Sequence, residues 1–402
     1  MKPIYLDNNA TTACDPAVVE AMLPFFTEQF GNASSIHSFG NQVGLALKQA
    51  RAQIQALLGA EQDSEIIFTS GGTESDNTAI LSALKAQPGR NQIITTVVEH
   101  PAVLALCDRL EKDGYVVHKL RVDGRGRLDI DEYKALLNDR VAIVSVMWAN
   151  NETGTIFPVE EMAEIAHARG IQFHTDAVQA VGKIPIDLAR SKIDMLSLSG
   201  HKLHGPKGLG VLYLRRGTRF RSLIHGGQQE RGRRPGTENS PAIMGLGKAA
   251  ELVMQHFETE NNEVRYLRDK LEKGILAKVP RAYPTGDLHN RLPNTSSIAF
   301  EFVEGEGILL MLNKLGIAAS SGSACTSGSL EPSHVMRAMG IPYTAAHGTI
   351  RFSLSRYNTL EEVERVIEAV PPIIAQLRKI SPYWGEAGPI ADPEKMFAPA
   401  YN

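Results

Sequence analysis

The sequence predicts an α/β protein in which a large domain, built on a mostly parallel sheet, is joined to a smaller α+β domain. Between residues 64 and 214, short apolar runs of strand length alternate with stretches of helical period. This alternation is typical of a parallel sheet covered by helices. Beyond residue 295 the pattern changes to strand, helix, two strands and a final helix. At 402 residues the chain is also too long for one small core, so two domains are expected.

The individual elements follow from apolar period and from turn residues. Seven strands are predicted for the large domain, at 65–69, 93–98, 115–120, 141–147, 171–175, 193–198 and 211–214. Helices are predicted at 15–26, 40–58, 76–84 and 159–168, and one long helix or two joined helices at 241–277 connect the domains. The small domain is predicted to contain strands 295–302, 317–320 and 349–354 and helices 305–315 and 359–379. The tail from residue 382 is rich in Pro, Gly and Ala, and is expected to be poorly ordered.

The composition excludes several classes of function. An apolar fraction of 43% and a charged fraction of 22% are those of a soluble globular protein. A net charge of −3 gives no reason to expect nucleic acid or an anionic membrane as a partner. No run is long enough to span a bilayer, and the N-terminus has no apolar signal-peptide core. The three cysteines are far apart and form no CxxC, so a reducing, cytoplasmic location is expected.

Four residues with useful chemistry each follow a predicted strand. They are His100, Asn151, Asp176 and Lys202. In open α/β sheets, ligands bind outside the carboxyl ends of the strands, so these side chains are expected at one edge. An isolated Asp there more often caps a helix, and a lone His before Pro101 is more often structural. Four such residues at one edge are harder to explain as caps or structural residues, and together they favour a ligand site.

Lys202 is the centre of this group. It lies in 197–210, SLSGHKLHGPKGLG, a polar glycine-containing turn between two strands. A lysine amine can form an imine with an aldehyde when burial or nearby cations lower its pKa. Pyridoxal phosphate is the aldehyde that enzymes use as an electron sink, and it needs a lysine, an acid facing the ring nitrogen and a phosphate cradle. A single lysine is usually an exposed surface residue, so the interpretation depends on those other parts.

A phosphate cradle is predicted at 70–75, SGGTES. A strand, a Gly-Gly-Thr turn and a helix start would present free backbone N–H groups and the positive end of the helix dipole to an anion. Thr73 could add a hydroxyl, but it could equally be the N-cap of the helix.

Cys325 has the surroundings of a reactive cysteine. Residues 320–330, SSGSACTSGSL, are small and polar, so the thiol is expected to be exposed, whereas structural cysteines prefer apolar pockets. Cys107 lies among apolar residues and is expected in the core. For Cys14 a structural role is also expected. The basic segment 215–234 could suggest nucleic acid, but aromatic residues are few there, and a solvated or intersubunit loop is the better interpretation.

Together these segments resemble the pyridoxal phosphate-dependent cysteine desulfurases, which have the aspartate aminotransferase fold (fold type I). The resemblance extends from Tyr5 to about Ser381 and rests on eight motifs in order: YLDNNATT, TSGGTESDN, EHPAV, NNETGTI, HTDAVQA, SLSGHKLHGPKG, RRPGTEN and SSGSACTSG. The long last motif is similar to that of the group containing the IscS and NifS proteins. The ending beyond Trp384 departs from the housekeeping members, which favours the branch that serves nitrogenase.

The resemblance implies a role for each candidate residue. Lys202 would carry the cofactor, Asp176 would pair with the ring nitrogen, and His100 would stack on the ring and transfer protons. Other contacts to the cofactor would come from Gly72, Thr73, Asn151, Gln179, Ser199, Gly200 and His201. Thr237 would reach the phosphate in the second subunit of a homodimer. Arg351 would bind the substrate carboxylate, with Asn8 and Asn32 lining the pocket.

The implied reaction converts L-cysteine to L-alanine and leaves a persulfide on Cys325. An iron–sulfur scaffold protein would accept this sulfur, and the persulfide would also be a transient ligand of an iron–sulfur cluster. The domains would comprise residues 15–259 (large), residues 1–14 with 260–381 (small, carrying the cysteine loop), and a tail at 382–402.

Alternatives remain at this point. They are a housekeeping desulfurase for iron–sulfur clusters or tRNA thiolation, a selenocysteine lyase or an aminotransferase on the same fold, and a cofactor-free scaffold that docks an assembly protein. A metal site at His201 and His204 is weak, because no cysteine or carboxylate set completes it.

Overall fold

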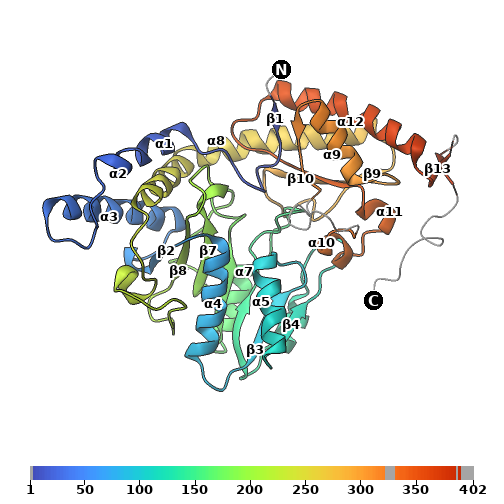
Figure 1. Cartoon of the computed structure of the whole chain (residues 1–402). Coiled ribbons are helices and arrows are strands. Elements are labelled where there is room, and N and C mark those ends of the chain that lie inside the picture. Colours follow the sequence, from blue (N-terminus) through green and yellow to red (C-terminus); the bar gives the residue numbers. More distant parts are fainter. Residues whose placement is uncertain (1–2, 322–330, 386–387, 391–402) are drawn as a thin grey trace.

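A seven-stranded sheet forms the centre of the large domain. The computed structural model describes residues 3–321, 331–385 and 388–390 (Figure 1). The strands lie in the order β2-β8-β7-β6-β5-β3-β4, and only β8 runs antiparallel to its neighbours. Their bounds are β2 Ile66–Thr69, β3 Gln92–Thr96, β4 Val116–Leu120, β5 Val141–Ser145, β6 Gln172–Asp176, β7 Met195–Ser199 and β8 Gly210–Leu214. The predicted mostly parallel sheet of seven strands is confirmed.

Helices pack on both faces of this sheet. They are α3 Ser38–Leu58, α4 Gly72–Ala86, α5 Pro101–Lys112, α6 Ile130–Leu136 and α7 Val159–His167. Alternate residues of β2 enter different cores, because successive side chains of a strand point to opposite faces. Ile66 and Phe68 belong to one apolar cluster, whereas Ile67 packs with Cys107 of α5 in the other. Cys107 is fully buried, as the sequence predicted.

Some predicted helices differ from those observed. The helix expected at 15–26 is divided into α1 Pro16–Met22 and α2 Pro24–Thr27, because Pro24 has no N–H to continue the hydrogen-bond ladder. Helix α4 begins four residues before the predicted start, at Gly72. Helices α5 and α6 were not predicted.

The small domain has its own core around a three-stranded sheet. Strand β10 Thr295–Phe300 lies between β12 Thr349–Ser353 and β9 Ala282–Pro284, and β1 Ile4–Tyr5 pairs with β11 Ile317–Ala318. The helices there are α9 Gly305–Lys314, α10 His334–Ala338, α11 Tyr343–Ala346 and α12 Leu360–Ile380. Helix α8, Ser240–Lys278, extends from the large domain into the small one across the upper half of Figure 1. None of the helices in the described part of the chain is long and apolar enough to cross a membrane.

The expectation of a poorly ordered tail is wrong for its first residues. Strands β13 Trp384–Gly385 and β14 Gly388–Pro389 form a short hairpin. The centre of the Trp384 ring lies 5.7 Å from that of Phe302, and the Arg378 guanidinium lies 4.4 Å from the centre of the Trp384 ring. The Pro, Gly and Ala content of the tail gives no indication of these contacts of Trp384, which depend on residues outside the tail.

Candidate active site

A cavity of about 290 Å³ lies at the carboxyl-terminal edge of the large sheet. This volume is near the lower end of the range for small-molecule sites. The cavity brings together all four residues that follow predicted strands, together with most of the other candidates. The predicted residues that line it are Gly72, Thr73, His100, Asn151, Asp176, Gln179, Ser199, His201, Lys202 and Arg351.

One wall of the cavity is the glycine turn at the start of α4. Gly71 is the N-cap and Gly72 the first helical residue, so Thr73 lies in the first turn and is not the cap. This resolves the alternative left open by the sequence. Close packing requires glycine here: a Cβ on Gly72 would lie 2.8 Å from Cγ2 of Val178. The first turn of this 15-residue helix therefore offers backbone N–H groups and positive dipole to an anion.

Lys202 ends a short 3-10 helix, Gly200–Lys202, directly after β7. Its Nζ donates hydrogen bonds to the backbone oxygens of Asn9 (2.5 Å) and Ala10 (2.7 Å). The opening segment of the chain, from which only Asn8 was predicted to line the pocket, thus also supplies Asn9 and Ala10 to the site. The available signal was a cluster of polar turn residues directly after a short strand.

Asp176 is the last residue of β6 and is 6% exposed. One carboxylate oxygen accepts a hydrogen bond from the Val178 N–H at 2.9 Å. Burial raises the pKa of Asp176, whereas the hydrogen bond from the Val178 N–H and the nearby Lys202 ammonium favour the charged form. A protonated ring nitrogen opposite this carboxylate would be a suitable partner.

Two histidines border the cavity in the neutral form. His100 caps α5, and its Nδ1 accepts the N–H of Ala102 at 3.1 Å, so Nε2 carries the ring hydrogen. Burial lowers the pKa of His100. Burial and the nearby ammonium of Lys202 lower the pKa of His201 to about 4, and its Nδ1 lies 3.0 Å from the hydroxyl of Thr11.

Arg351, on β12, lies across the cavity and is 3% exposed. Its guanidinium donates to Asp7 at 2.7 Å and to the backbone oxygen of Asn151 at 2.9 Å. Its Nε is buried and has no hydrogen-bond partner among the residues that the structure describes. Asp7 was not predicted, because nothing in the local sequence links it to a residue at the other end of the chain.

Other predicted residues lie elsewhere. Asn8 lines a smaller neighbouring cavity, and Gly200 is buried beside the site. Asn32 and Thr237 are exposed and do not line the larger cavity. Cys325 lies outside the described residues.

The residues of the cavity fit pyridoxal phosphate. A lysine amine, a buried carboxylate and the N-terminus of α4 are the three groups that this cofactor needs, and all three line one cavity of suitable size. The fold and the site together define a pyridoxal phosphate-dependent enzyme with the aminotransferase fold.

Comparisons with known proteins agree with this class. The family model "Aminotransferase class-V" matches residues 4–366. "Cysteine desulfurase NifS" of Azotobacter vinelandii is 73% identical over 402 residues, covering all of both chains. A cysteine desulfurase of Gluconacetobacter diazotrophicus is 67% identical, again over the full length of both. A solved structure titled "NIFS-LIKE PROTEIN" has a TM-score of 0.87 at 38% identity, covering 93% of this chain and 100% of that one.

The chain therefore belongs to the class-V aminotransferase family and, within it, to the cysteine desulfurases. Pyridoxal phosphate is its cofactor and L-cysteine its substrate.

Proposed function

We propose that Lys202 holds the cofactor in this desulfurase and that Cys325 receives the sulfur of L-cysteine, in the branch that supplies nitrogenase. The observation that supports the cofactor site best is the presence of Lys202, Asp176 and the Gly72–Thr73 turn in one cavity. The Asp176 carboxylate would oppose the ring nitrogen, and Ser199 and His201 would complete the phosphate contacts with the turn. Asn151 and Gln179 would bind the ring oxygen.

Bound pyridoxal phosphate supplies an electron sink for the electrons of a broken Cα–H bond. The residues of the chain provide the rest. The Lys202 amine would take and return the Cα proton, and this role is supported by the position of its Nζ at the cavity wall, where it donates to two backbone oxygens. His100 would stack on the ring and carry its hydrogen on Nε2.

Arg351 would hold the substrate carboxylate. Its planar fork suits a carboxylate, and the Asp7 carboxylate already bound at one nitrogen shows that the site tolerates such a partner. The substrate would arrive as a second carboxylate, for which the buried Nε is a further donor.

Cys325 would act on the sulfur of L-cysteine. Its thiolate attacks that sulfur, an S–S bond forms, the C–S bond breaks, and alanine leaves after the substrate carbon gains a proton. The proposal for Cys325 is supported by its small polar surroundings in sequence and by the similarity to cysteine desulfurases. Its persulfide would be the transient iron–sulfur ligand.

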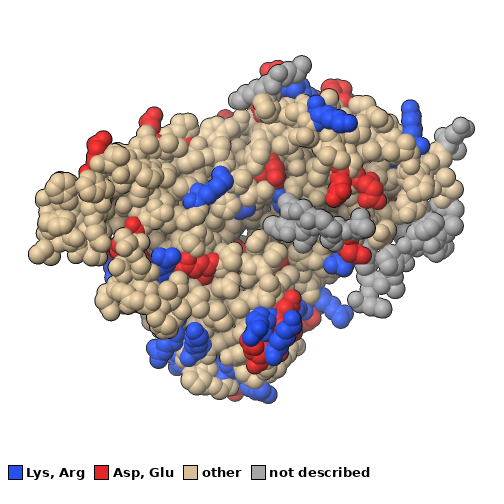
Figure 2. All heavy atoms as spheres, viewed as in Figure 1, with Lys and Arg blue, Asp and Glu red and all other residues tan. Residues whose placement is uncertain are grey.

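A homodimer is part of the proposal. Thr237 is exposed at the surface, and would reach the cofactor phosphate of a partner subunit. Large apolar side chains are also exposed along α1, α2 and the start of α3: Val19, Leu23, Phe26, Phe30, Ile36, Phe39 and Leu45. The tip formed by these helices carries almost no charged side chains on the face shown in Figure 2. A surface of this kind favours burial against a second copy.

The physiological assignment rests on similarity. The relative named NifS is 73% identical along its whole length, which supports sulfur delivery to an iron–sulfur scaffold for nitrogenase in the cytoplasm. The proposed domain division at residue 260 is consistent with a separate apolar cluster that contains Ile4, Leu6 and residues from Val264 onward.

The test compares the wild type, Lys202→Ala and Cys325→Ala in the same assay. We expect Lys202→Ala to lose the visible absorbance of the bound cofactor. We expect Cys325→Ala to keep it and to form neither alanine nor sulfide from L-cysteine. Full turnover by Cys325→Ala would reject its role, and would favour a lyase acting without a protein thiol. A lost cofactor in Cys325→Ala would instead show that the variant is misfolded, which circular dichroism checks.

A further inference from the structure

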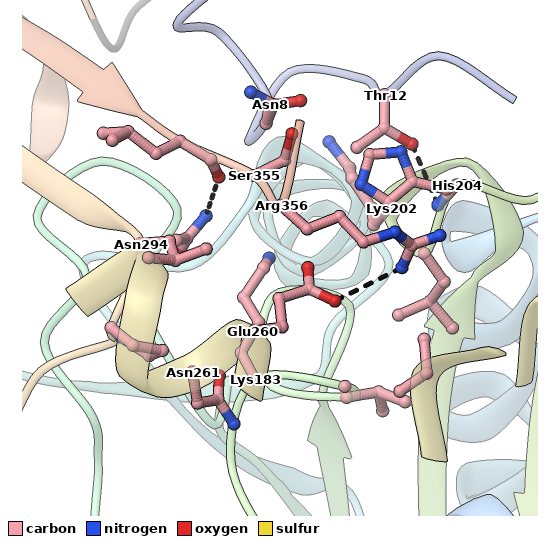
Figure 3. A pocket seen from close by; sticks show the side chains of 17 residues that line it. Asn8, Thr12, Lys183, Lys202, His204, Glu260, Asn261, Asn294, Ser355 and Arg356 are labelled. Atoms are coloured by element: carbon pink, nitrogen blue, oxygen red, sulfur yellow. Dashed lines mark hydrogen bonds and ion pairs between the residues drawn. The ribbon is translucent and has the colours of Figure 1, made fainter. Parts of the chain in front are cut away.

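A second lysine, Lys183, lies on the side of the site away from the larger cavity. It borders a small cavity of about 30 Å³, whose wall also includes Lys202. Figure 3 shows the Lys183 side chain extending into this cavity beside Glu260. No role in cofactor binding was expected for Lys183 from the sequence, and it does not line the larger cavity.

The amine of Lys183 makes two hydrogen bonds to one residue of the active site, Gln179; this pair of contacts is called the clamp below. Its Nζ donates to the backbone oxygen of Gln179 at 3.1 Å and to the side-chain Oε1 of Gln179 at 3.0 Å. Gln179 is 5% exposed and lines the larger cavity. The clamp therefore joins the small cavity to the wall of the cofactor site.

These contacts determine which way the Gln179 carboxamide points. Burial and the nearby Lys202 ammonium lower the pKa of Lys183 to about 7, so the protonated amine predominates below that pH. In this form the amine only donates hydrogen bonds, and Oε1 must face Lys183. The amide nitrogen Nε2 then points to the backbone oxygen of Asn9, 2.9 Å away, which only accepts. Nε2 has two hydrogens, and this contact uses one of them. The second remains for an acceptor in the cavity.

The same group of contacts reaches Lys202. The backbone oxygen of Asn9 that accepts from Gln179 also accepts from Lys202 Nζ. Lys183, Gln179, Asn9 and Lys202 thus form one continuous hydrogen-bonded chain. Disturbing the first member changes the partner that orients the second.

We propose that Lys183 is a positioning residue: it fixes the Gln179 carboxamide with its nitrogen available to the ring oxygen of pyridoxal phosphate. This inference rests on the proposed contact between Gln179 and the cofactor. Without Lys183, Oε1 loses its donor, and only the backbone oxygen of Asn9 still favours this orientation. The neighbouring cavity is large enough for water, but water can donate or accept, so it does not select one orientation. The flipped carboxamide would set an oxygen against the ring oxygen.

The experiment is a double-mutant cycle on cofactor binding, with Lys183→Met, Gln179→Ala and the double variant. Binding is followed through the fluorescence of Trp148, which lies between two cavity-lining residues, Met147 and Ala149. Each single variant is expected to weaken the affinity for pyridoxal phosphate about tenfold, the effect of losing one hydrogen bond in a buried site. The double variant should be no weaker than Gln179→Ala, because Lys183 acts through Gln179.

Three outcomes would overturn the inference. If Lys183→Met weakens binding equally in the Gln179→Ala background, Lys183 acts by its charge near Lys202 or through folding. If Lys183→Met binds as tightly as the wild type, Lys183 does not position Gln179. If Gln179→Ala has no effect, both this inference and the proposed contact of Gln179 fail. Lys183→Arg is the conservative control: it keeps a donor-only cation and should recover most of the affinity.

Discussion

Gly210→Ala should damage both the stability of the sheet and the cofactor site. Gly210 begins β8, where it pairs with Thr69 of β2 on one side and Ser199 of β7 on the other. A Cβ at this position would lie 2.6 Å from Cα of Gly71, 2.7 Å from its carbonyl carbon and 2.7 Å from the oxygen of Leu198. All three atoms belong to the backbone, so no side chain can rotate away.

The size of the effect follows from these distances. Carbon atoms pack best at about 3.5–4.0 Å, so the Gly71 backbone must move by roughly 1 Å. Overpacking of this kind costs about 1–3 kcal/mol, and we expect the upper end because the contacts are with two separate strand ends. The displaced turn is the one that would hold the phosphate. A misplacement of about 1 Å in such a site can reduce the rate on the order of 100-fold.

The assay combines urea unfolding with titration of pyridoxal phosphate. Gly124→Ala is the matched control, since the nearest atom to its added Cβ is 3.6 Å away and its φ is not positive. The control should behave as wild type in both measurements. If Gly210→Ala has wild-type stability and wild-type cofactor affinity, the close approach of β8 to the glycine turn does not hold in solution.

Three further outcomes are expected. Glu230→Gln should lower the free energy of unfolding by about 3 kcal/mol, because the Glu230 carboxylate pairs with the Arg51 guanidinium at 2.6 and 2.8 Å in a largely buried site. Chemical denaturation measures this free energy, and a loss below about 1 kcal/mol would contradict the prediction. Burial raises the pKa of Glu99 from 4.5 to about 8, so its folded-state proton stabilises the protein at low pH and this contribution disappears as the pH rises from about 4.5 to about 8. In Glu99→Gln this part of the pH dependence should be absent. If the free energy of unfolding of this variant falls between pH 5 and pH 8 by as much as that of the wild type, Glu99 does not cause the dependence. Arg351→Lys should raise KM for L-cysteine more than tenfold with a smaller change in kcat, because Lys lacks the planar fork that also holds Asp7; an unchanged KM in steady-state kinetics would argue against carboxylate binding by Arg351.

Much of the large domain could be predicted because its signals are local. The strands of the sheet are apolar runs bounded by turn residues, and their positions agree with the structure to within a few residues. Parallel pairing then places the carboxyl ends together, which is why His100, Asn151, Asp176 and Lys202 could be grouped before any coordinates.

What could not be predicted depends on contacts between distant parts of the chain. Asp7 reaches Arg351, and Asn9 reaches Lys202, only after the N-terminal segment lies along the edge of the sheet. Helix α5 was missed because it begins with a continuous apolar run, 101–107, and such a run alone does not distinguish a helix from a strand. The orienting contact from Lys183 to Gln179 spans four residues, but its importance depends on where the carboxamide faces.

Helix α8 determines how this protein can be divided. It is 39 residues long, about 58 Å at 1.5 Å per residue. Its first half buries Leu246 and Val253 in one core, and its second half buries Leu271 and Ile275 in the other. A gene divided anywhere within this helix would therefore leave each fragment with only part of α8, and would expose apolar side chains that are buried in the intact protein. We therefore expect the large and small domains to be stable only when they are expressed together as one chain.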